Sequence, residues 1–261
     1  MRVLLSLTCL LASAPAVAAQ SGTARRSLAD EASFAAGSVA WGVTAPLHWS
    51  SRTWLGIGAS TLGLAAISTL DAAMRDAARR NRSGFVDALA RDMKPFGREG
   101  SAGALGAFLV AAIAFGDERA RAVAFDGIAA SALASGLLVP ALQAAIGRSR
   151  PWHERGEYDF KAFSGRHSLP SGHTAQAFVT ASVIAAHYNA VWADITAYGV
   201  ASAVGLSRMV HDAHHLTDVM AGAAIGTLIG RAVVSRGAGS RSGARITPAV
   251  GHGSLGIEVR F

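Results

Sequence analysis

The chain has 261 residues, of which 51% are hydrophobic and only 16% are charged. This composition excludes a disordered protein and argues against an ordinary soluble enzyme, because soluble domains carry about 25% charged residues. The formal net charge is +7, and arginine supplies nearly all of the positive charge. Arginine binds phosphate bidentately, so the charge favours a phosphorylated substrate or an acidic lipid. The sequence has no lysine-rich arm of the kind that binds nucleic acid.

The first 19 residues have the pattern of a signal peptide. A short basic end, Met1–Arg2, precedes an apolar run and an Ala-x-Ala site, with cleavage expected after Ala18 or Ala19. An uncleaved membrane anchor is the alternative interpretation. Cys9, the one cysteine of the sequence, lies inside this segment, so we expect no disulfide or thiol chemistry in the mature chain. The pattern predicts a bacterial exported protein.

Apolar stretches without strand-like alternation recur along the chain and predict an all-α fold. Most are at or just below the roughly 20 residues needed to cross a bilayer, and their many small residues suit close helix packing. We expect an N-terminal segment over 20–52 that could hold an extra helix, a helical bundle over 53–235, and a linker with a hairpin over 236–261. The apolar stretches lie at about 34–48, 53–70, 102–116, 122–146, 173–193, 195–206 and 216–235.

Residues 71–100 differ from the rest, because acidic and basic side chains are interleaved there with apolar ones. We interpret this segment as an amphipathic interfacial helix or a helical loop, with a solvated helix of a soluble protein as the alternative. Near the C-terminus, alternating apolar residues flank the turn Gly251–Ser254. This pattern predicts a β-hairpin that is peripheral to the bundle.

Three polar clusters lie at the ends of expected helices. The first, Gly147–Pro151, follows one expected helix, and the second, Pro170–His173, opens the next. The third, Ser207–Asp218, again lies between a helix that ends and one that begins. Two antiparallel helix pairs would therefore bring all three clusters to one end of the bundle, where they could assemble a site.

The clusters contain donors that suit a phosphate group. Arg148, Arg150 and Arg208 offer forked guanidinium donors. Ser171, Gly172 and the backbone N–H groups that follow lie at the positive end of a helix, where anions bind. Together they predict a phosphate cradle. Anchorage at a membrane interface is the alternative for Arg148 and Arg150.

Histidines complete a hydrolytic site. His214 and Asp218 share one helical face, so Asp218 can hold one ring nitrogen and leave the other free as a nucleophile. His173 lies beside the cradle and can protonate a leaving oxygen. The alternative is a zinc site from His211, His214, His215 and Asp218. An arginine-rich cradle repels cations, so we expect no metal and no cofactor.

These residues resemble the type 2 phosphatidic acid phosphatase superfamily, which shares its site with vanadium haloperoxidases and class A bacterial acid phosphatases. The family pattern is Lys-x6-Arg-Pro, then Pro-Ser-Gly-His, then Ser-Arg-x5-His-x3-Asp. The second motif is intact at Pro170–His173 and the third from Ser207 to Asp218. The first keeps Arg150-Pro151, but Gln143 stands at the position of the lysine.

The resemblance implies a six-helix membrane core and a metal-free mechanism. His214 would attack phosphorus and form a phosphohistidine, Asp218 would orient it, and His173 would protonate the leaving group. Because Gln143 is neutral, we predict a working but weaker cradle in which Arg148 compensates in part. The phosphoryl oxygens would be held by Arg150, Ser171, Gly172 and Arg208.

Counting membrane crossings from a periplasmic residue 20 places all three clusters on the periplasmic side. The arginines after the last helix then lie in the cytoplasm, as the positive-inside tendency favours. We therefore expect a bacterial inner-membrane enzyme that hydrolyses a lipid phosphate or pyrophosphate at a periplasm-facing site. The alternatives are a soluble periplasmic acid phosphatase of broad specificity, a haloperoxidase, and a non-catalytic membrane protein that binds lipid phosphates.

Overall fold

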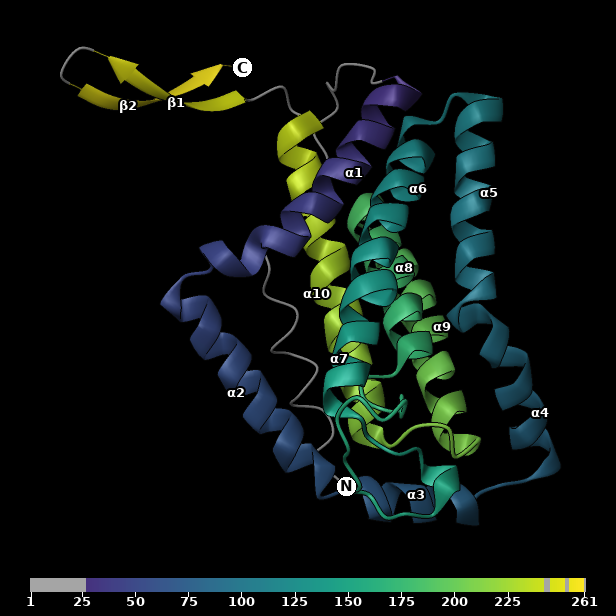
Figure 1. The fold of residues 1–261 in the computed structure, drawn as a ribbon. Helices are drawn as coiled ribbons and strands as arrows, with labels where there is room; N and C mark the ends of the chain where they lie inside the picture. Colours follow the sequence, from purple (N-terminus) through teal and green to yellow (C-terminus); the bar gives the residue numbers. More distant parts are fainter. Residues whose placement is uncertain (1–26, 242–244, 252–253, 261) are drawn as a thin grey trace.

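The structure is a computed structural model that describes residues 27–241, 245–251 and 254–260. The expected signal peptide lies outside these ranges. The described chain folds mainly into helices, as the apolar pattern predicts (Figure 1). In chain order the longer helices are α1 (Leu28–Thr44), α2 (Ser51–Ser68), α3 (Asp71–Arg80), α4 (Gly84–Met93), α5 (Glu99–Phe115), α6 (Glu118–Ser131), α7 (Val139–Ile146), α8 (Gly172–Tyr188), α9 (Val191–Val210) and α10 (Leu216–Arg241).

Helix α8 lies at the centre of the bundle. It packs against α10, α9 and α6, and α1 and α5 cover α6 from outside (Figure 1). A π-helical segment, η4 (Ala132–Leu138), joins α6 to α7 directly before Pro140. Proline cannot donate the usual helical hydrogen bond, and a wider turn before it keeps the long helix continuous.

The core is built from small apolar side chains. Val123, Val179, Val183 and Val233 are fully buried, and most of the other buried apolar residues are alanines. His187 is partly buried near the end of α8, and its Nε2 lies 2.8 Å from the carboxylate of buried Asp126.

Glycines on α10 let it approach α8 closely. A Cβ atom at Gly222 would lie 2.5 Å from the carbonyl oxygen of Ser171. Cβ atoms at Gly226 and Gly230 would fall on the carbonyl oxygen of Ala175 and the hydroxyl of Ser182. Only glycine permits such contact between helix backbones, so this stripe sets the distance between the two helices.

The boundary between the two helices that follow the second cluster differs from the sequence expectation. We expected it near residue 194, but α8 ends at Asn189, which adopts a left-handed conformation with φ 46°. Asparagine tolerates this conformation and often follows the last residue of a helix, so Asn189 is the sequence signal for this boundary. As a result α9 begins at Val191 and has 20 residues.

The segment 71–100 forms α3, α4 and the short helix η3 (Lys94–Gly97). It packs against the bundle, because α4 contacts α9 and η3 contacts both α8 and α9. In Figure 1, α3 crosses beneath the end of the bundle where α8 and α10 begin. The interpretation as an interfacial or solvated helix is therefore incomplete, since this segment also covers the site end of the molecule.

Two helical stretches are long and apolar enough to cross a membrane, Glu118–Ile146 and Leu216–Ala238. Two further spans are added if α2 with α3, bent by 49°, and the segment from Gly84 to Phe115, bent by 50°, each count as one. By length and composition these helices support a membrane protein. Helix α8, with 17 residues, is shorter than a typical span.

After α10 the chain forms two short strands, β1 (Arg245–Gly251) and β2 (Ser254–Arg260). They pair antiparallel with Arg245 opposite Arg260, and Figure 1 draws them apart from the helices. The helices alone therefore define the fold.

The close approach of α8 and α10 leads to a prediction for Gly226→Ala. The added methyl group would meet backbone atoms of α8, so we expect the free energy of unfolding to fall by about 1–3 kcal/mol. Gly63→Ala in α2, where nothing lies within 4 Å of the new atom, should leave stability unchanged or raise it slightly. Thermal unfolding in detergent compares the two variants, and equal midpoints would contradict a backbone contact at Gly226.

Candidate active site

The three polar clusters meet at one end of the bundle, where α7 ends, α8 begins, α9 ends and α10 begins. The backbone N–H of Ser171 donates to the carbonyl oxygen of Asp218 at 2.9 Å. His214 contacts the carbonyl oxygen of Ser168. The second and third clusters are therefore joined by direct hydrogen bonds, as the antiparallel arrangement of helices predicts.

The connection between α7 and α8 folds back on itself to place the first cluster. Gly147 ends α7 with φ 62°, and a Cβ atom there would fall on the backbone of Lys161. Arg148 and Phe160 then form an antiparallel bridge. The N–H of Ser149 donates to the carbonyl oxygen of Asp159 at 3.0 Å. A glycine is required here, because the chain turns with positive φ at a point of close approach.

His214 is buried, with 4% of its surface exposed. Its Nδ1 lies 2.8 Å from the carbonyl oxygen of Ser168 and 3.6 Å from a carboxylate oxygen of Asp218. Both neighbours are acceptors, so Nδ1 carries the proton and Nε2 keeps a free lone pair. Burial also lowers the pKa of His214, which keeps the ring neutral. The nearest orienting group is thus a backbone carbonyl, and Asp218 contributes from farther away.

Asp218 is fully buried and lies at the centre of a polar network. Its carboxylate accepts from Nη1 of Arg148 at 2.8 Å, from the hydroxyl of Ser168 at 2.5 Å and from the backbone N–H of His215 at 2.9 Å. A buried carboxylate is tolerated only when it is well paired. The network therefore holds the start of α10 and the residues around His214 in one geometry.

Arg148 does not lie in the cradle where the sequence pattern placed it. It is only 1% exposed, and Nη2 donates to Asp71 at 2.7 Å while Nη1 donates to Asp218. Its Nε donates to the carbonyl oxygen of Glu157. With these donors engaged, Arg148 is not available to bind phosphate or to compensate for Gln143, and we assign it to positioning Asp218.

Arg150 and Arg208 are the arginines left for an anion. Within the described ranges neither guanidinium has an ion-pair partner among the carboxylates. Arg150 stacks on Trp152 at 4.7 Å and makes a long contact of 3.4 Å to the carbonyl oxygen of His167. Burial lowers the pKa of both arginines, and repulsion by Arg150 lowers that of Arg208 further. Two neighbouring cations without a counterion favour an anionic ligand between them.

The first turn of α8 faces this pair. Ser171 is the N-cap of the helix, and its hydroxyl oxygen accepts from the hydroxyl of Thr174 at 2.9 Å. The N–H groups of Gly172 and His173 are among those that a helix leaves without internal partners. Gln143 donates from Nε2 to the carbonyl oxygen of Pro170 at 2.8 Å. This hydrogen bond supports the turn before α8 and uses one of the two N–H donors of the amide.

His173 lies near Arg208 and His214 at the start of α8. Burial, followed by the positive charge of Arg208, lowers the pKa of His173 to about 4. Gly97 of η3 packs on its ring, since a Cβ atom at Gly97 would lie 2.9 Å from Cβ and Cδ2 of His173. A bound phosphate would oppose the repulsion by the arginines and raise this pKa, so the ring can accept a proton when the site is filled.

His211 and His215 lie beside the residues of the site. His211 lies 3.4 Å from Nη2 of Arg208, and Nδ1 of buried His215 lies 3.3 Å from Asp218. Across the described residues no group of three or more His, Cys, Asp or Glu side chains is arranged to hold a metal ion.

Helix α3 supplies partners that the sequence interpretation missed. Asp71 accepts from Arg148 and from the backbone N–H of Thr217 at 2.9 Å. Arg75 and Arg79 pair with Asp212 at 3.2 and 3.1 Å. The three α3 residues follow one another at intervals of four, which places them on one helical face. That spacing was the available signal, but nothing in it indicated which distant segment the face would contact.

The residues that build this site fall within a recognised sequence family. Residues 127–239 match the model of the PAP2 superfamily. This match covers less than half of the chain. The match includes all three polar clusters but not α3. Asp71 therefore lies outside the matched residues and contacts two residues within them, Arg148 and Thr217.

Curated relatives of the PAP2 region are similar over short stretches. A lipid A 1-phosphatase of Porphyromonas gingivalis is 40% identical over 81 residues, which cover 29% of this chain and 18% of that protein. A lipid A 1-phosphatase of Rhizobium etli is 38% identical over 102 residues, or 35% of this chain and 41% of that protein. The matched region spans less than half the length of these relatives.

Solved PAP2 structures share the fold. LpxE of Aquifex aeolicus has a TM-score of 0.50 and 22% identity, and the match covers 64% of this chain and 95% of that one. A transmembrane PAP2-type phosphatidylglycerolphosphate phosphatase from Bacillus subtilis has a TM-score of 0.53 and 21% identity, with coverage of 70% and 94%. At this level of identity the likeness concerns the arrangement of helices.

The buried contact between Arg148 and Asp71 predicts the effect of Asp71→Asn. The substitution weakens the buried hydrogen bonds that Asp71 accepts from Arg148 and Thr217, while Arg148 keeps its contact with Asp218. We therefore expect the free energy of unfolding to fall by about 1–3 kcal/mol. Asp76→Asn, at an exposed position on the same helix, should have little effect. Denaturant unfolding measures both changes, and the same unfolding midpoint for the two variants would count against the bridge.

Proposed function

We propose that this protein is a metal-independent phosphatase that hydrolyses a lipid phosphate or pyrophosphate through a phosphohistidine intermediate. One observation carries the proposal. Buried His214 bonds through Nδ1 to a backbone carbonyl, which leaves Nε2 as a free nucleophile beside two arginines. These are Arg150 and Arg208, which form no ion pair with any carboxylate in the described part of the chain. A neutral nucleophile next to two cationic side chains suits attack on phosphorus.

The proposed reaction has two steps. In the first, Nε2 of His214 attacks phosphorus, the bond from phosphorus to the leaving oxygen breaks, and protonated His173 gives that oxygen its proton. In the second, neutral His173 takes a proton from water, the water oxygen attacks phosphorus, and the bond to His214 breaks. Phosphate leaves, and both histidines return to their starting protonation states.

The surrounding residues stabilise charge during both steps. Arg150, Arg208, the hydroxyl of Ser171 and the N–H groups of Gly172 and His173 would hold the non-bridging oxygens, where negative charge is spread in the transition state. Asp218 and the carbonyl of Ser168 would stabilise the positive charge that develops on His214. Arg148 would keep Asp218 in place.

The proposed substrate is a lipid because the chain has helices that suit a membrane and relatives named lipid A 1-phosphatase. Among phosphatidate, phosphatidylglycerol phosphate, polyprenyl pyrophosphate and a lipid A phosphate, those names favour the last. We further propose that the site faces the periplasm from the inner membrane, since this orientation leaves Arg236 and Arg241, at the C-terminal end of α10, on the cytoplasmic side.

A non-catalytic lipid-phosphate-binding protein is a second candidate. It is favoured by one observation, that Gln143 replaces a cationic residue of the PAP2 pattern and donates to Pro170 rather than to the cradle. Such a protein would bind lipid phosphates without releasing phosphate, and turnover separates the two candidates.

The deciding experiment is phosphate release by the purified chain in detergent, with EDTA present, on a panel of lipid phosphates and a soluble aryl phosphate. We expect activity on a lipid, and a loss of at least about a thousandfold in His214→Ala because the nucleophile is removed. His48→Ala, at an exposed position far from the site in sequence, is the matched control. Activity abolished by EDTA would overturn the metal-free mechanism, and binding without turnover would favour the second candidate.

Gln143→Lys tests the charge of the cradle. A lysine at this position could still donate to the carbonyl of Pro170 and would add a positive charge near the phosphate. Because charge-assisted hydrogen bonds are about twice as strong as neutral ones, we expect kcat/KM to rise by about threefold to tenfold. Gln143→Met, which has neither donor nor charge, should lower it. Unchanged kinetics in the lysine variant would show that the cradle is not limited by charge.

A further inference from the structure

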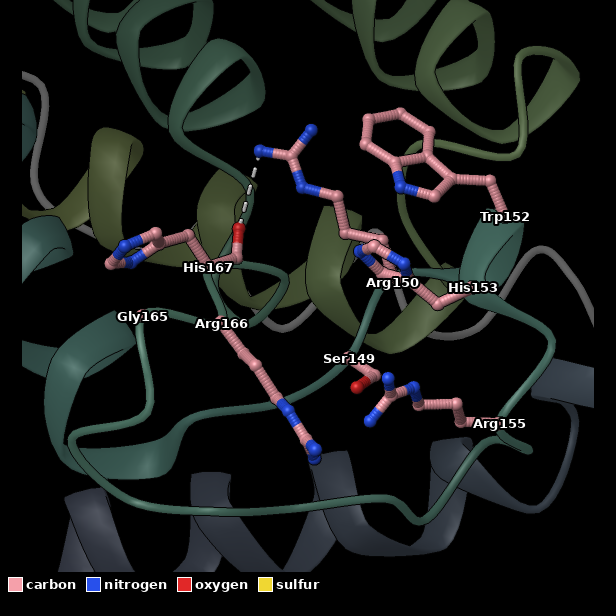
Figure 2. A pocket seen from close by; sticks show the side chains of 8 residues that line it. All are labelled: Ser149, Arg150, Trp152, His153, Arg155, Gly165, Arg166 and His167. Carbon is pink, nitrogen blue, oxygen red and sulfur yellow. Dashed lines mark hydrogen bonds between the residues drawn. The ribbon is translucent and has the colours of Figure 1, made fainter.

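A basic pocket lies beside the cradle and is not used by the proposed reaction. The connection between α7 and α8 encloses a cavity of about 390 Å³ (Figure 2). This volume falls within the range of about 300–1,000 Å³ for small-molecule sites, so it can admit a charged group together with part of the head group that bears it. The lining residues are Ser149, Arg150, Trp152, His153, Arg155, Gly165, Arg166 and His167.

The charge of this pocket is strongly positive. Of the described residues that line it, three are arginines, two are histidines and none is acidic. Asp159 is the neighbouring carboxylate, and it is engaged by Arg166 at 2.7 Å and by the hydroxyl of Ser149 at 2.6 Å. Arg155 is exposed and makes no hydrogen bond or ion pair with another described residue. Arg155 lies close enough to Asp159 to help lower the pKa of that carboxyl. Its guanidinium makes no direct contact with the carboxylate within the described ranges, so its donors remain available to a ligand.

Arg150 connects the pocket to the cradle. Figure 2 shows Arg150 extending toward the helices, whereas the guanidinium groups of Arg155 and Arg166 end on the opposite side of the view, near Ser149. The contacts of Arg150 with Trp152 and with the carbonyl of His167 hold it in this direction. The side chain of Arg150 is therefore directed toward the cradle. The guanidinium groups of Arg155 and Arg166 lie in the pocket.

We propose that this pocket is a second anion subsite, in which Arg155 and Arg166 bind another phosphate group of the same substrate molecule. Arginine suits this role because its forked donors match phosphate oxygens. The inference rests on the proposed function and narrows it, since the preferred substrate is then a lipid with two phosphate groups. One phosphate reacts at His214 while the other is held in the pocket.

The test compares two lipids that differ only in the second phosphate. The substrates are a lipid that carries two phosphates and the same lipid with the reacting phosphate alone. We expect the wild-type chain to favour the first lipid in kcat/KM. Arg155→Gln should reduce that preference by about tenfold, the loss of one charge-assisted hydrogen bond, with the change in KM rather than in kcat. Arg155→Lys should restore part of it, and Arg52→Gln on α2 is the matched charge control.

Three outcomes would overturn the subsite: no preference in the wild-type chain, a preference unchanged in Arg155→Gln, or an equal loss on both lipids. An equal loss would indicate general attraction to anionic membranes. A second measurement does not depend on turnover. Equilibrium binding of inorganic phosphate to His214→Ala should reveal two sites per chain, one of which is lost when Arg155→Gln is added. If phosphate binds twice but neither lipid is hydrolysed, the subsite stands and the proposed function fails.

Discussion

The buried guanidinium of Arg148 is the interaction on which the site depends. It lies between two carboxylates, those of Asp71 and Asp218, that are themselves fully buried. Removing three charges from water is costly unless each is paired, so the arrangement is stable only when α3, the connection after α7 and the start of α10 are all in place. The hydrogen bonds from Thr217 to Asp71 and from Ser168 to Asp218 complete the pairing. The site therefore forms only when α3, the connection after α7 and the start of α10 pack together.

Two arginines separated by a single residue have opposite surroundings. Arg148 is paired with two carboxylates, whereas Arg150 stacks on a tryptophan and forms no ion pair with a carboxylate among the residues that the structure describes. This difference concentrates unbalanced positive charge at the position where an anion would meet His214. It also explains why the chain can hold a buried carboxylate, Asp218, close to a phosphate cradle, since the charge of Arg148 shields the two anions from each other.

Glycine residues set the distances between the helices that carry the polar network. The glycines of α10 bring its backbone against α8, and Gly222 meets the carbonyl of Ser171 directly at the cradle. Both helices begin at the site, so their close packing sets the distance between the first turn of α8 and Asp218 near the start of α10. At the other side of the cradle, Gly97 packs on His173. A glycine-rich and alanine-rich composition thus serves the geometry of the site as well as the apolar character of the helices.

The sequence alone determined the helical class, the approximate helices and the grouping of the three clusters at one end, because apolar periodicity, helix-ending residues and motif spacing are local signals. It also singled out His173, His214 and Asp218 as neighbours. Only the tertiary structure decided the partners of equivalent side chains. Arg148 forms a hydrogen bond with Asp71, which is 77 residues away in the sequence. The charged face of α3 packs against the residues around the site. Such pairings depend on burial and on three-dimensional proximity, which no local pattern encodes.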